Sequence, residues 1–326
     1  MQSFLSRRAV VLALLSAPLL PGCANLYSGS STANRKRSLL MDDPAQAQQP
    51  SLPPTAVQQS VIQQVNVFLS QLEKQAQGRL GLSAMNTANQ MRIDYRASER
   101  FPLCSTFKLV AVAAILQQSM HNASLLQQHI DFTLQQVQDS GYAPITAQHV
   151  DRGMTVSELC AACISYSDNA AANLLLQILG GPAALTRFAR SLGDHTFRLD
   201  LWEPALNTAL PQDERDTSTP AAMTDTLQRL LLGNVLAPTQ RELLLYWLKN
   251  NTTGNARIRA GVPNSWIVGD KTGTGAYGTS NDIGIVWPNQ QAPIILAIYF
   301  TCPDKTAKPN DAIIASASRI VCQALR

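Results

Sequence analysis

The 326-residue chain has few charged and few aromatic residues. Charged residues make up 15% of the chain and aromatic residues 6%, while hydrophobic residues make up 45%. This composition is typical of a globular protein and excludes a disordered, collagen-like or coiled-coil chain. The length allows one compact unit with additional terminal segments.

Histidine and cysteine are also scarce. The four histidines, His121, His129, His149 and His195, form no cluster with metal-ligand spacing. The sequence therefore supports neither a zinc centre nor a triad with a histidine base, and we expect no metal and no cofactor.

After Cys23, an odd number of cysteines is left: Cys104, Cys160, Cys163, Cys302 and Cys322. They cannot all pair within one chain. Cys160 and Cys163 lie in a helical pattern with no second such pair beside them, so we interpret them as buried thiols rather than a redox or metal site. We predict no disulfide, and Cys302 with Cys322 is the pair that is hardest to exclude.

Positive charge is in small excess and lies mostly at the N-terminus. Residues 1–56 hold five basic and two acidic side chains, so they carry +3 of the formal +4 and leave +1 for residues 57–326. A domain this close to neutrality does not indicate a nucleic-acid surface.

The first apolar run, Ala9 to Leu20, is too short to span a bilayer comfortably. It follows Arg7-Arg8, as in an export signal; the arginines resemble a twin-arginine signal and also suit the general secretory route. Leu20-Pro21-Gly22-Cys23 resembles a lipobox, which predicts a lipid on Cys23 and a membrane tether. Cleavage nearby with loss of Cys23 is the alternative. By either route we expect an exported, periplasmic protein.

The chain divides by composition into three parts. Residues 1–23 are the predicted export signal. Residues 24–56 are rich in Ser, Gln, Pro and Asn without a sustained apolar period, which predicts a flexible linker. Residues 57–326 are expected to form a single catalytic domain.

Within this domain, predicted strands lie at both ends and predicted helices lie between them. The expected elements are a helix at 57–77, a hairpin of strands at 80–85 and 91–95, a mostly helical stretch at 105–236, strands at 266–274, 282–287 and 293–301, and a helix at 311–325. We predict an α/β fold of the α+β type, with an antiparallel five-stranded sheet built from both chain ends and flanked by helices. The sheet lobe is assigned to 57–100 and 250–326, and an all-helical lobe to 101–249. The site is expected in the cleft between the lobes.

Three short motifs carry the chemistry. Ser105-Thr106-Phe107-Lys108 begins a predicted helix, so a hydroxyl and an amine share one helix face and can meet. Taken alone, Ser105 could be a helix cap and Lys108 a surface charge. However, Ser167-Asp168-Asn169 follows, and Lys271-Thr272-Gly273-Thr274 lies on a predicted strand. Each motif is weak alone, but their order and spacing are specific.

These motifs resemble those of class A β-lactamases, and the resemblance covers nearly all of residues 57–326. The segment Arg198 to Asn207, RLDLWEPALN, resembles the family loop that carries the general base. The resemblance implies a β-lactamase/transpeptidase-like fold. It also implies hydrolysis of the β-lactam amide of penicillins and cephalosporins through an acyl-enzyme on Ser105, so that β-lactam antibiotics are the expected partners.

The resemblance also assigns roles in catalysis. Lys108, or Glu203 through a water, accepts the proton of Ser105, and this choice is left open. Ser167 passes a proton to the departing lactam nitrogen. Glu203 activates the water that releases the acyl group, with Asn207 beside it. Asp168 is interpreted as structural.

Binding roles follow in the same way. Asn169 is expected to bind the side-chain amide of the antibiotic, and Lys271 to supply positive charge. Backbone N–H groups of Ser105 and Thr274 would form the oxyanion hole. The substrate-binding set implied by the resemblance is Tyr142, Asn169, Asn207, Arg257, Lys271, Thr272, Gly273 and Thr274.

Two of these assignments have close alternatives. Arg257, Thr272 and Thr274 would receive the antibiotic's carboxylate, since Ser280 occupies the position of the arginine found in other members; Arg257 could instead be a surface arginine. Tyr142 would lie at the mouth of the cleft, or could be a packed loop tyrosine.

The sequence departs from the family pattern at three points. Leu201 replaces an arginine that pairs with an aspartate, here Asp216, so we expect a looser loop that admits bulkier cephalosporins. Gly275 stands where carbapenem-hydrolysing members carry the cysteine that pairs with the equivalent of Cys104, which predicts a free Cys104 thiol. Val112 stands where many members carry a cysteine that pairs with the equivalent of Cys160.

Two other functions compete with the hydrolase. A penicillin-binding peptidase shares the Ser-x-x-Lys chemistry but would not need the Glu203 loop. A non-hydrolytic β-lactam receptor would acylate and stay acylated, and would usually show additional membrane spans. We expect a monomeric hydrolase.

Overall fold

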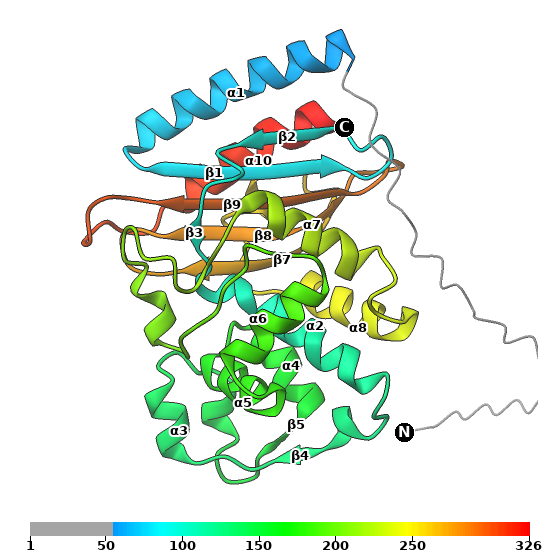
Figure 1. The fold of residues 1–326 in the computed structure, drawn as a ribbon, viewed down its shortest axis with the longest axis vertical. Coiled ribbons are helices and arrows are strands. Elements are labelled where there is room, and N and C mark those ends of the chain that lie inside the picture. The colour runs from blue at the N-terminus through cyan, green and yellow to red at the C-terminus, as the bar shows by residue number, and fades with distance from the viewer. Residues whose placement is uncertain (1–54) are drawn as a thin grey trace, which may run out of the picture. The chain divides into compact units, whose positions relative to one another are not determined.

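The computed structural model describes residues 55–326 (Figure 1). The predicted leader, Cys23 and nearly all of the predicted linker lie outside the described residues. Within the described range, no helix is both long and apolar enough to cross a membrane.

A five-stranded antiparallel sheet combines the two ends of the chain, as predicted. Its strands are β1 (Arg79–Asn86), β2 (Arg92–Tyr95), β7 (Ile267–Thr274), β8 (Ser280–Trp287) and β9 (Ile294–Thr301). They lie in the order β2-β1-β9-β8-β7, so β9 joins the N-terminal hairpin to the C-terminal strands. The motif strand β7 is therefore an edge strand of the sheet.

Strand β9 is apolar on both faces because both faces are covered. Side chains alternate along a strand. Ile294, Leu296, Ile298 and Phe300 belong to one hydrophobic cluster, while Ile295, Ala297 and Tyr299 belong to another. The sheet thus separates two cores.

Helices α1 (Ala56–Ala76) and α10 (Asp311–Leu325) cover the outer face of the sheet (Figure 1). The α1 helix begins with a capping box, in which the Thr55 hydroxyl accepts from the Gln58 N–H and the Gln58 side chain accepts from the Thr55 N–H. Val65 and Leu69 of α1 pack into the outer core with α10.

The other face of the sheet meets the helical part of the chain. Helix α7 (Pro220–Leu231) packs on β1 and β9, and α8 (Pro238–Lys249) packs on β7. These two helices lie within the predicted helical lobe, residues 101–249, yet they cover the sheet. The remaining lobe helices are α2 (Phe107–Ser119), α3 (Leu134–Asp139), α4 (Val156–Ser165), α5 (Asn169–Leu179) and α6 (Pro182–Ser191).

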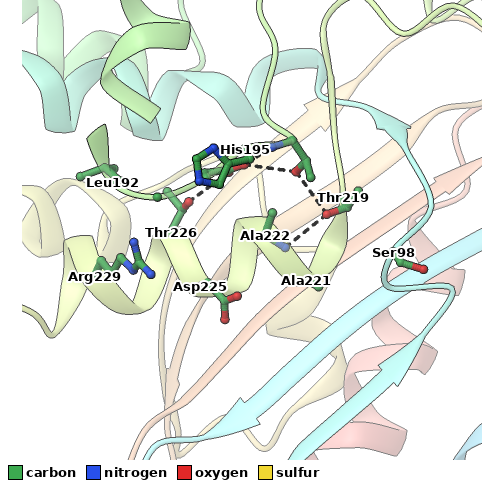
Figure 2. A pocket seen from close by; sticks show the side chains of 12 residues that line it. Ser98, Leu192, His195, Thr219, Ala221, Ala222, Asp225, Thr226 and Arg229 are labelled. Carbon is green, nitrogen blue, oxygen red and sulfur yellow. Dashed lines mark hydrogen bonds between the residues drawn. The ribbon is translucent and has the colours of Figure 1, made fainter. Parts of the chain in front are cut away.

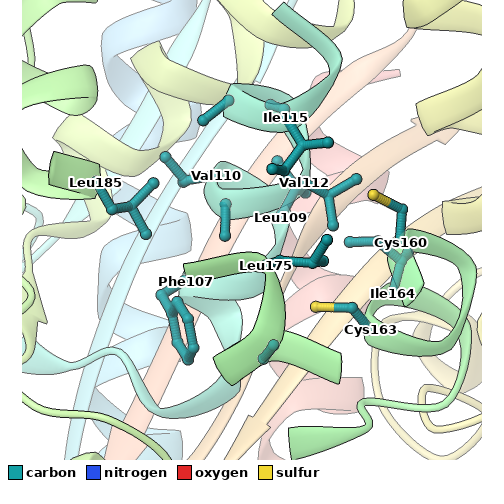
Figure 3. Packing of buried hydrophobic residues seen from close by; sticks show 14 of the residues in the cluster. Phe107, Leu109, Val110, Val112, Ile115, Cys160, Cys163, Ile164, Leu175 and Leu185 are labelled. Atoms are coloured by element: carbon teal, nitrogen blue, oxygen red, sulfur yellow. The ribbon is translucent and has the colours of Figure 1, made fainter. Parts of the chain in front are cut away.

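Helix α2 is the central element of this lobe. It is buried on nearly all sides and contacts α4, α5, α6 and α8, consistent with its uniformly apolar sequence (Figure 3). Each fully buried Leu, Ile or Phe contributes about 1.5–3 kcal/mol to stability. The helix that carries Lys108 is therefore held rigidly at the base of the cleft.

Short elements connect these layers. They are the 3₁₀ turns η1 (Cys104–Thr106), η2 (Leu125–Gln127), η3 (Thr146–Gln148) and η4 (Ala205–Thr208), the strand pairs β3 (Phe101–Pro102) with β6 (Thr217–Ser218) and β4 (His129–Ile130) with β5 (Met154–Thr155), and helix α9 (Ile258–Gly261). The β3–β6 pair ties the chain before Ser105 to the end of the loop that carries Glu203.

All five cysteines in the described part of the chain are free thiols, which confirms that no disulfide joins them. Val112 and Cys160 pack in the same core cluster (Figure 3). Cys104 lies against Gly275, where an added Cβ would stand 2.7 Å from its Sγ. The predicted free Cys104 thiol is thus confirmed, and burial raises its pKa above the usual range.

Candidate active site

The three motifs and the Glu203 loop meet in a cleft between the helical lobe and β7. Ser105 lies in turn η1, which packs on β7 and runs directly into α2. Its side chain is 8% exposed, so the hydroxyl is mostly shielded yet reachable. The N-terminal end of a buried helix favours negative charge developing there.

Ser105 is linked to Lys108 through a carboxylate. The Ser105 Oγ donates to Glu203 Oε1 at 3.2 Å, and Lys108 Nζ lies 3.0 Å from the same oxygen. Among the described residues, no direct hydrogen bond joins Ser105 to Lys108, although the helix spacing suggested one. The reason is that Lys108 already donates to the Ser167 carbonyl at 2.8 Å and to Asn169 Oδ1 at 2.6 Å.

Lys108 is fully buried and is stabilised by these acceptors. A buried cation is costly unless it is paired and hydrogen-bonded. The Glu203 carboxylate supplies the opposite charge, and the two oxygens from Ser167 and Asn169 use the other ammonium protons. The interpretation of Lys108 as a surface charge is wrong.

Ser167 lies between two lysines. Its Oγ accepts from Lys271 Nζ at 2.9 Å and lies 3.4 Å from Lys108 Nζ. Its backbone has φ of 58°, a left-handed conformation that is uncommon for serine and turns the side chain into the cleft. Burial, and then the charge of Lys108, lower the pKa of Lys271 to about 7.

Asparagines on both sides hold Glu203 in place. Asn207 Nδ2 donates to Glu203 Oε2, so each carboxylate oxygen has a partner. Asn173 on α5 clamps the main chain: its Oδ1 accepts from the Glu203 N–H at 3.0 Å, and its Nδ2 donates to the Glu203 carbonyl at 2.9 Å. The Asn207 pairing was expected from the sequence; the Asn173 clamp was not.

Asp168 is structural, in line with its interpretation from the sequence. It caps α5 by accepting from the Ala171 N–H, and it also accepts from the N–H groups of Ile145 and Thr146 and from the Thr146 hydroxyl. It therefore fastens the loop that carries Tyr142 to the helix that carries Asn169.

Arg257 lines the cleft beside the end of β7. It is only 5% exposed, so the alternative of a surface arginine is wrong. Its guanidinium donates to the carbonyls of Gly273 and Asn281, to Thr274 Oγ1 at 2.7 Å, and to Asp311. It braces the end of β7 and keeps a positive charge beside the hydroxyls of the motif.

A cavity of about 250 Å³ opens at this site, and the predicted site residues Lys108, Glu203, Lys271 and Gly273 are not among its lining residues. Its lining residues are Ser105, Tyr142, Ser167, Asn169, Asn207, Thr253, Arg257, Thr272 and Thr274. Tyr142 is 58% exposed, which places it at the mouth rather than in the core. Thr253 was not predicted; its hydroxyl lies 2.6 Å from that of Thr272, but the preceding turn carries no motif that could have indicated it.

Size alone does not identify the site. A larger cavity of about 340 Å³ runs along α7 beside the loop around His195 (Figure 2). None of its lining residues belongs to the three motifs. The Thr226 hydroxyl donates to Asp194 there, but no lysine lies among the lining residues. None of the histidines lines the catalytic cavity, and no cluster among the described residues could hold a metal ion.

Comparison with known proteins agrees with this geometry. The model of the β-lactamase enzyme family matches residues 62–325. The β-lactamase CTX-M-97 of Escherichia coli is 53% identical over 253 residues, which cover 78% of this chain and 86% of that protein. The chain belongs to the class A serine β-lactamase family.

Other relatives match the same part of this β-lactamase. The carbapenem-hydrolysing β-lactamase KPC of Klebsiella oxytoca is 52% identical, with 78% of this chain and 87% of that protein covered. A crystal structure of a β-lactamase from Burkholderia phymatum has a TM-score of 0.80 at 48% identity and covers 82% of this chain and all of that one. A β-lactamase structure from Desulfarculus baarsii has a TM-score of 0.79 at 50% identity, covering 81% and 98%.

The loop from Arg198 to Asp216 of this β-lactamase is closed without an arginine clamp. Asp216 is buried, and its Oδ1 accepts from the N–H groups of Asp200 and Leu201 at 2.8 and 2.9 Å. Burial raises the pKa of this carboxyl, against the two backbone hydrogen bonds. The main chain thus takes over part of the contact that the missing arginine would make, and Leu201 packs against the helical core instead.

Proposed function

We propose that this β-lactamase hydrolyses the lactam amide of penicillins and cephalosporins through an acyl-enzyme on Ser105, released by a water that Glu203 activates. One observation carries the proposal: Glu203 Oε1 accepts a hydrogen bond from the Ser105 hydroxyl, and the same oxygen forms an ion pair with Lys108. A base that contacts both the nucleophile and Lys108 can accept a proton in acylation and again in deacylation.

In acylation, Ser105 Oγ attacks the lactam carbonyl carbon and loses its proton. Glu203 Oε1 is within hydrogen-bond reach of that proton, directly at 3.2 Å, and Lys108 Nζ is 3.0 Å from the oxygen that would receive it. The proton therefore enters the Glu203–Lys108 pair. Backbone N–H groups of Ser105 and Thr274 stabilise the oxyanion, and losing one such donor costs about a hundredfold or more in rate.

Breaking the lactam C–N bond requires a proton on the departing nitrogen. Ser167 supports this role because its Oγ touches both Lys271 and Lys108. Ser167 gives its proton to nitrogen and regains one from the lysine pair. The acyl-enzyme then carries an ester on Ser105, and the former lactam nitrogen is a neutral amine.

Deacylation needs a water beside the ester and a base to take its proton. Glu203 is held for this by Asn207 on its Oε2 and by Asn173 on its main chain. Water attacks the ester carbon while Glu203 accepts its proton, and the Glu203–Lys108 pair then gives that proton to Ser105 Oγ as the ester bond breaks. This step separates a hydrolase from a protein that is merely acylated.

The substrate is bound by groups on two sides of the cavity. Asn169 and Asn207 would face the antibiotic's side-chain amide, and Tyr142 its outer edge. On the opposite side, Lys271, Thr272, Gly273 and Thr274 together with Arg257 would receive the carboxylate. The positive charges of Lys271 and Arg257 match the one negative charge common to penicillins and cephalosporins.

The test mixes purified protein with a chromogenic cephalosporin and follows both turnover and protein mass. Many turnovers per enzyme, lost in Ser105→Ala, are the expected result. One equivalent of product with a stable mass adduct would indicate a receptor instead. Hydrolysis of cell-wall peptides without β-lactam turnover would indicate a peptidase.

We further infer that the protein is exported, which the leader motif supports, and that it acts as a monomer. Lipidation of Cys23 is examined by radiolabelled palmitate in cells, with Cys23→Ser as the control. Labelling that disappears in the variant is expected; an unlabelled, freely soluble periplasmic protein would leave the ordinary signal peptide as the correct interpretation. Equilibrium sedimentation checks the monomer.

A further inference from the structure

Two aspartates lie buried behind the motif strand, outside the catalytic cavity. Asp270 on β7 and Asp282 on β8 both have fully buried side chains. In the sheet register Asp282 is opposite Thr272, so Asp270, two residues earlier, is its diagonal neighbour on the same face. Lys271, which lies between Asp270 and Thr272 on β7, points to the other face of the sheet.

The two carboxylates are unequally supplied with donors. Asp270 pairs with Arg259 at 2.6 Å and accepts from Asn251 Nδ2 at 2.7 Å. Asp282 accepts only the Ile258 N–H, at 3.0 Å, and its Oδ1 has no hydrogen-bond donor among the described residues. A buried carboxylate with one backbone donor is poorly stabilised as an anion.

The charged groups around Asp282 are accounted for. Asp270 and Lys271 come from β7, and Arg257 from the segment before α9. Arg257 directs its hydrogen bonds to Gly273, Asn281, Thr274 and Asp311, and none to Asp282. Lys271 donates to Ser167 and the Thr272 carbonyl. Arg259 and Asp311 pair with Asp270 and Arg257, respectively.

We propose that Asp270 and Asp282 form a buried acid pair that holds one proton, carried by Asp282, and that this pair positions residues 251–258 as the carboxylate-binding wall of the cleft. Two adjacent buried carboxylates cannot both ionise at low cost. The ion pair with Arg259 keeps Asp270 as the anion, and Asp282 as a neutral acid can donate its O–H toward that anion. Burial, and next the charge of Asp270, raise the pKa of Asp282.

The positioning role follows from what each aspartate touches. Asp270 holds Asn251, whose Oδ1 in turn accepts from the Thr253 N–H and hydroxyl. Asp282 holds the N–H of Ile258, next to Arg257. Gly254 lies so close to Asp270 Oδ2 that a Cβ there would overlap it. The pair thus fixes the segment that presents Thr253 and Arg257, and this part rests on the proposed function of that wall.

The first experiment requires no activity. It compares unfolding of wild type and Asp282→Asn from about pH 5 to about pH 8. The folded wild type keeps a proton that the unfolded chain releases above about pH 4, so wild-type stability falls as pH rises. We expect the unfolding equilibrium constant of wild type, relative to that of Asp282→Asn, to rise about tenfold per pH unit.

Asp94→Asn is the matched control, because Asp94 is a half-exposed strand aspartate paired with Arg92. Its curve should run parallel to that of wild type. A parallel curve for Asp282→Asn as well would overturn the acid pair. If Asp282→Asn does not fold, infrared spectroscopy of wild type decides: a protonated, slowly exchanging carboxyl at neutral pH supports the pair, and its absence contradicts it.

The second experiment tests positioning by kinetics. Asp282→Ala should raise KM for penicillins about tenfold with a smaller change in kcat, and Asp282→Asn should restore KM, since its amide can donate to Asp270 and accept from Ile258. A merely structural role would lower the active fraction, and so kcat, and leave KM unchanged. If the enzyme is inactive on all β-lactams, the proposed function is refuted. The pH dependence of unfolding still tests the Asp270–Asp282 acid pair in that case.

Discussion

The two faces of strand β7 hold their buried charges in different ways. On one face Lys271 points toward Ser167 and Lys108, and the nearby anion, Glu203, is shared between a lysine and a nucleophile. On the other face Arg257 and Arg259 are tied to Asp311, Asp270 and main-chain carbonyls. Donors and acceptors on the first face can exchange protons with a substrate, while those on the second are committed to the fold.

This contrast explains why both faces are needed. Catalytic groups must gain and lose protons at low cost, so it helps that each is hydrogen-bonded to another group that can take up or release a proton. Groups that orient a substrate must keep a fixed position, so most of their hydrogen-bond donors are bonded to other groups of the protein. A single strand supplies both because its side chains alternate. The predictions below separate the two faces by the kind of kinetic change that each loss should produce.

The largest of these effects is expected at Lys271. Lys271→Ala should lower kcat/KM by about a hundredfold, because a buried charge that meets the substrate carboxylate is lost. In wild type the pKa of Lys271 lies at about 7, so its positive charge is present below that pH and lost above it. We therefore expect kcat/KM to fall as pH rises through about 7.

Lys271→Arg is the control for this pH dependence, since arginine stays charged throughout. The alkaline fall should move to higher pH in that variant. An unchanged pH profile in Lys271→Arg would assign the fall to another group.

On the other face, Arg257→Ala should act mainly on binding. Loss of its charge and of the brace on β7 should raise KM for penicillins by about tenfold to a hundredfold, with a smaller loss in kcat. Steady-state kinetics with a penicillin and with its carboxylate ester distinguish the two contributions. An equal loss for both substrates would show that Arg257 acts only through the fold.

An intermediate effect is expected at Asn173. Asn173→Ala keeps the Glu203 carboxylate but removes both hydrogen bonds from the Asn173 side chain to the Glu203 main chain. We expect deacylation to slow about tenfold while acylation changes less, since a base displaced slightly loses much of its effect. Pre-steady-state burst amplitudes measure the two steps. Equal slowing of both would place the clamp outside the deacylation step.

The smallest effect concerns the loop clamp. Leu201→Arg should add a charged hydrogen-bond donor near the buried Asp216. After the loss of leucine packing, we expect the free energy of unfolding to rise by about 1 kcal/mol and Tm to rise by about 2–4 °C. Bulky cephalosporins should then be hydrolysed more slowly. An unchanged Tm together with unchanged turnover of bulky cephalosporins would contradict the looser-loop hypothesis.

The sequence indicated the sheet and most of the cavity because local patterns encode them. Alternating and apolar runs located β1, β7 and β9, and the motifs located the cavity residues Ser105, Ser167 and Thr272. A helical pattern does not say which layer a helix joins, which is why α7 was assigned to the helical lobe although it covers the sheet.

Contacts distant in sequence were the ones that could not be predicted. Thr253 enters the cavity on a loop that is held by contacts distant in sequence, from Asn251 to Asp270 and from Thr252 to the Ser165 carbonyl. The bond from Ser105 to Glu203 replaces the expected bond to Lys108 because three other acceptors compete for that ammonium. Asn173 was visible at helical spacing from Asn169, but nothing in the sequence indicated that it clamps Glu203.

The most direct test of the central claim is the lifetime of the acyl-enzyme in Glu203→Gln. The account predicts that this variant still reacts with a penicillin at Ser105 and then holds the adduct, with deacylation slowed by about a hundredfold to ten-thousandfold. Mass spectrometry after seconds to hours follows the adduct, and peptide mapping locates it. Release of the acyl group at the wild-type rate would contradict the role assigned to Glu203.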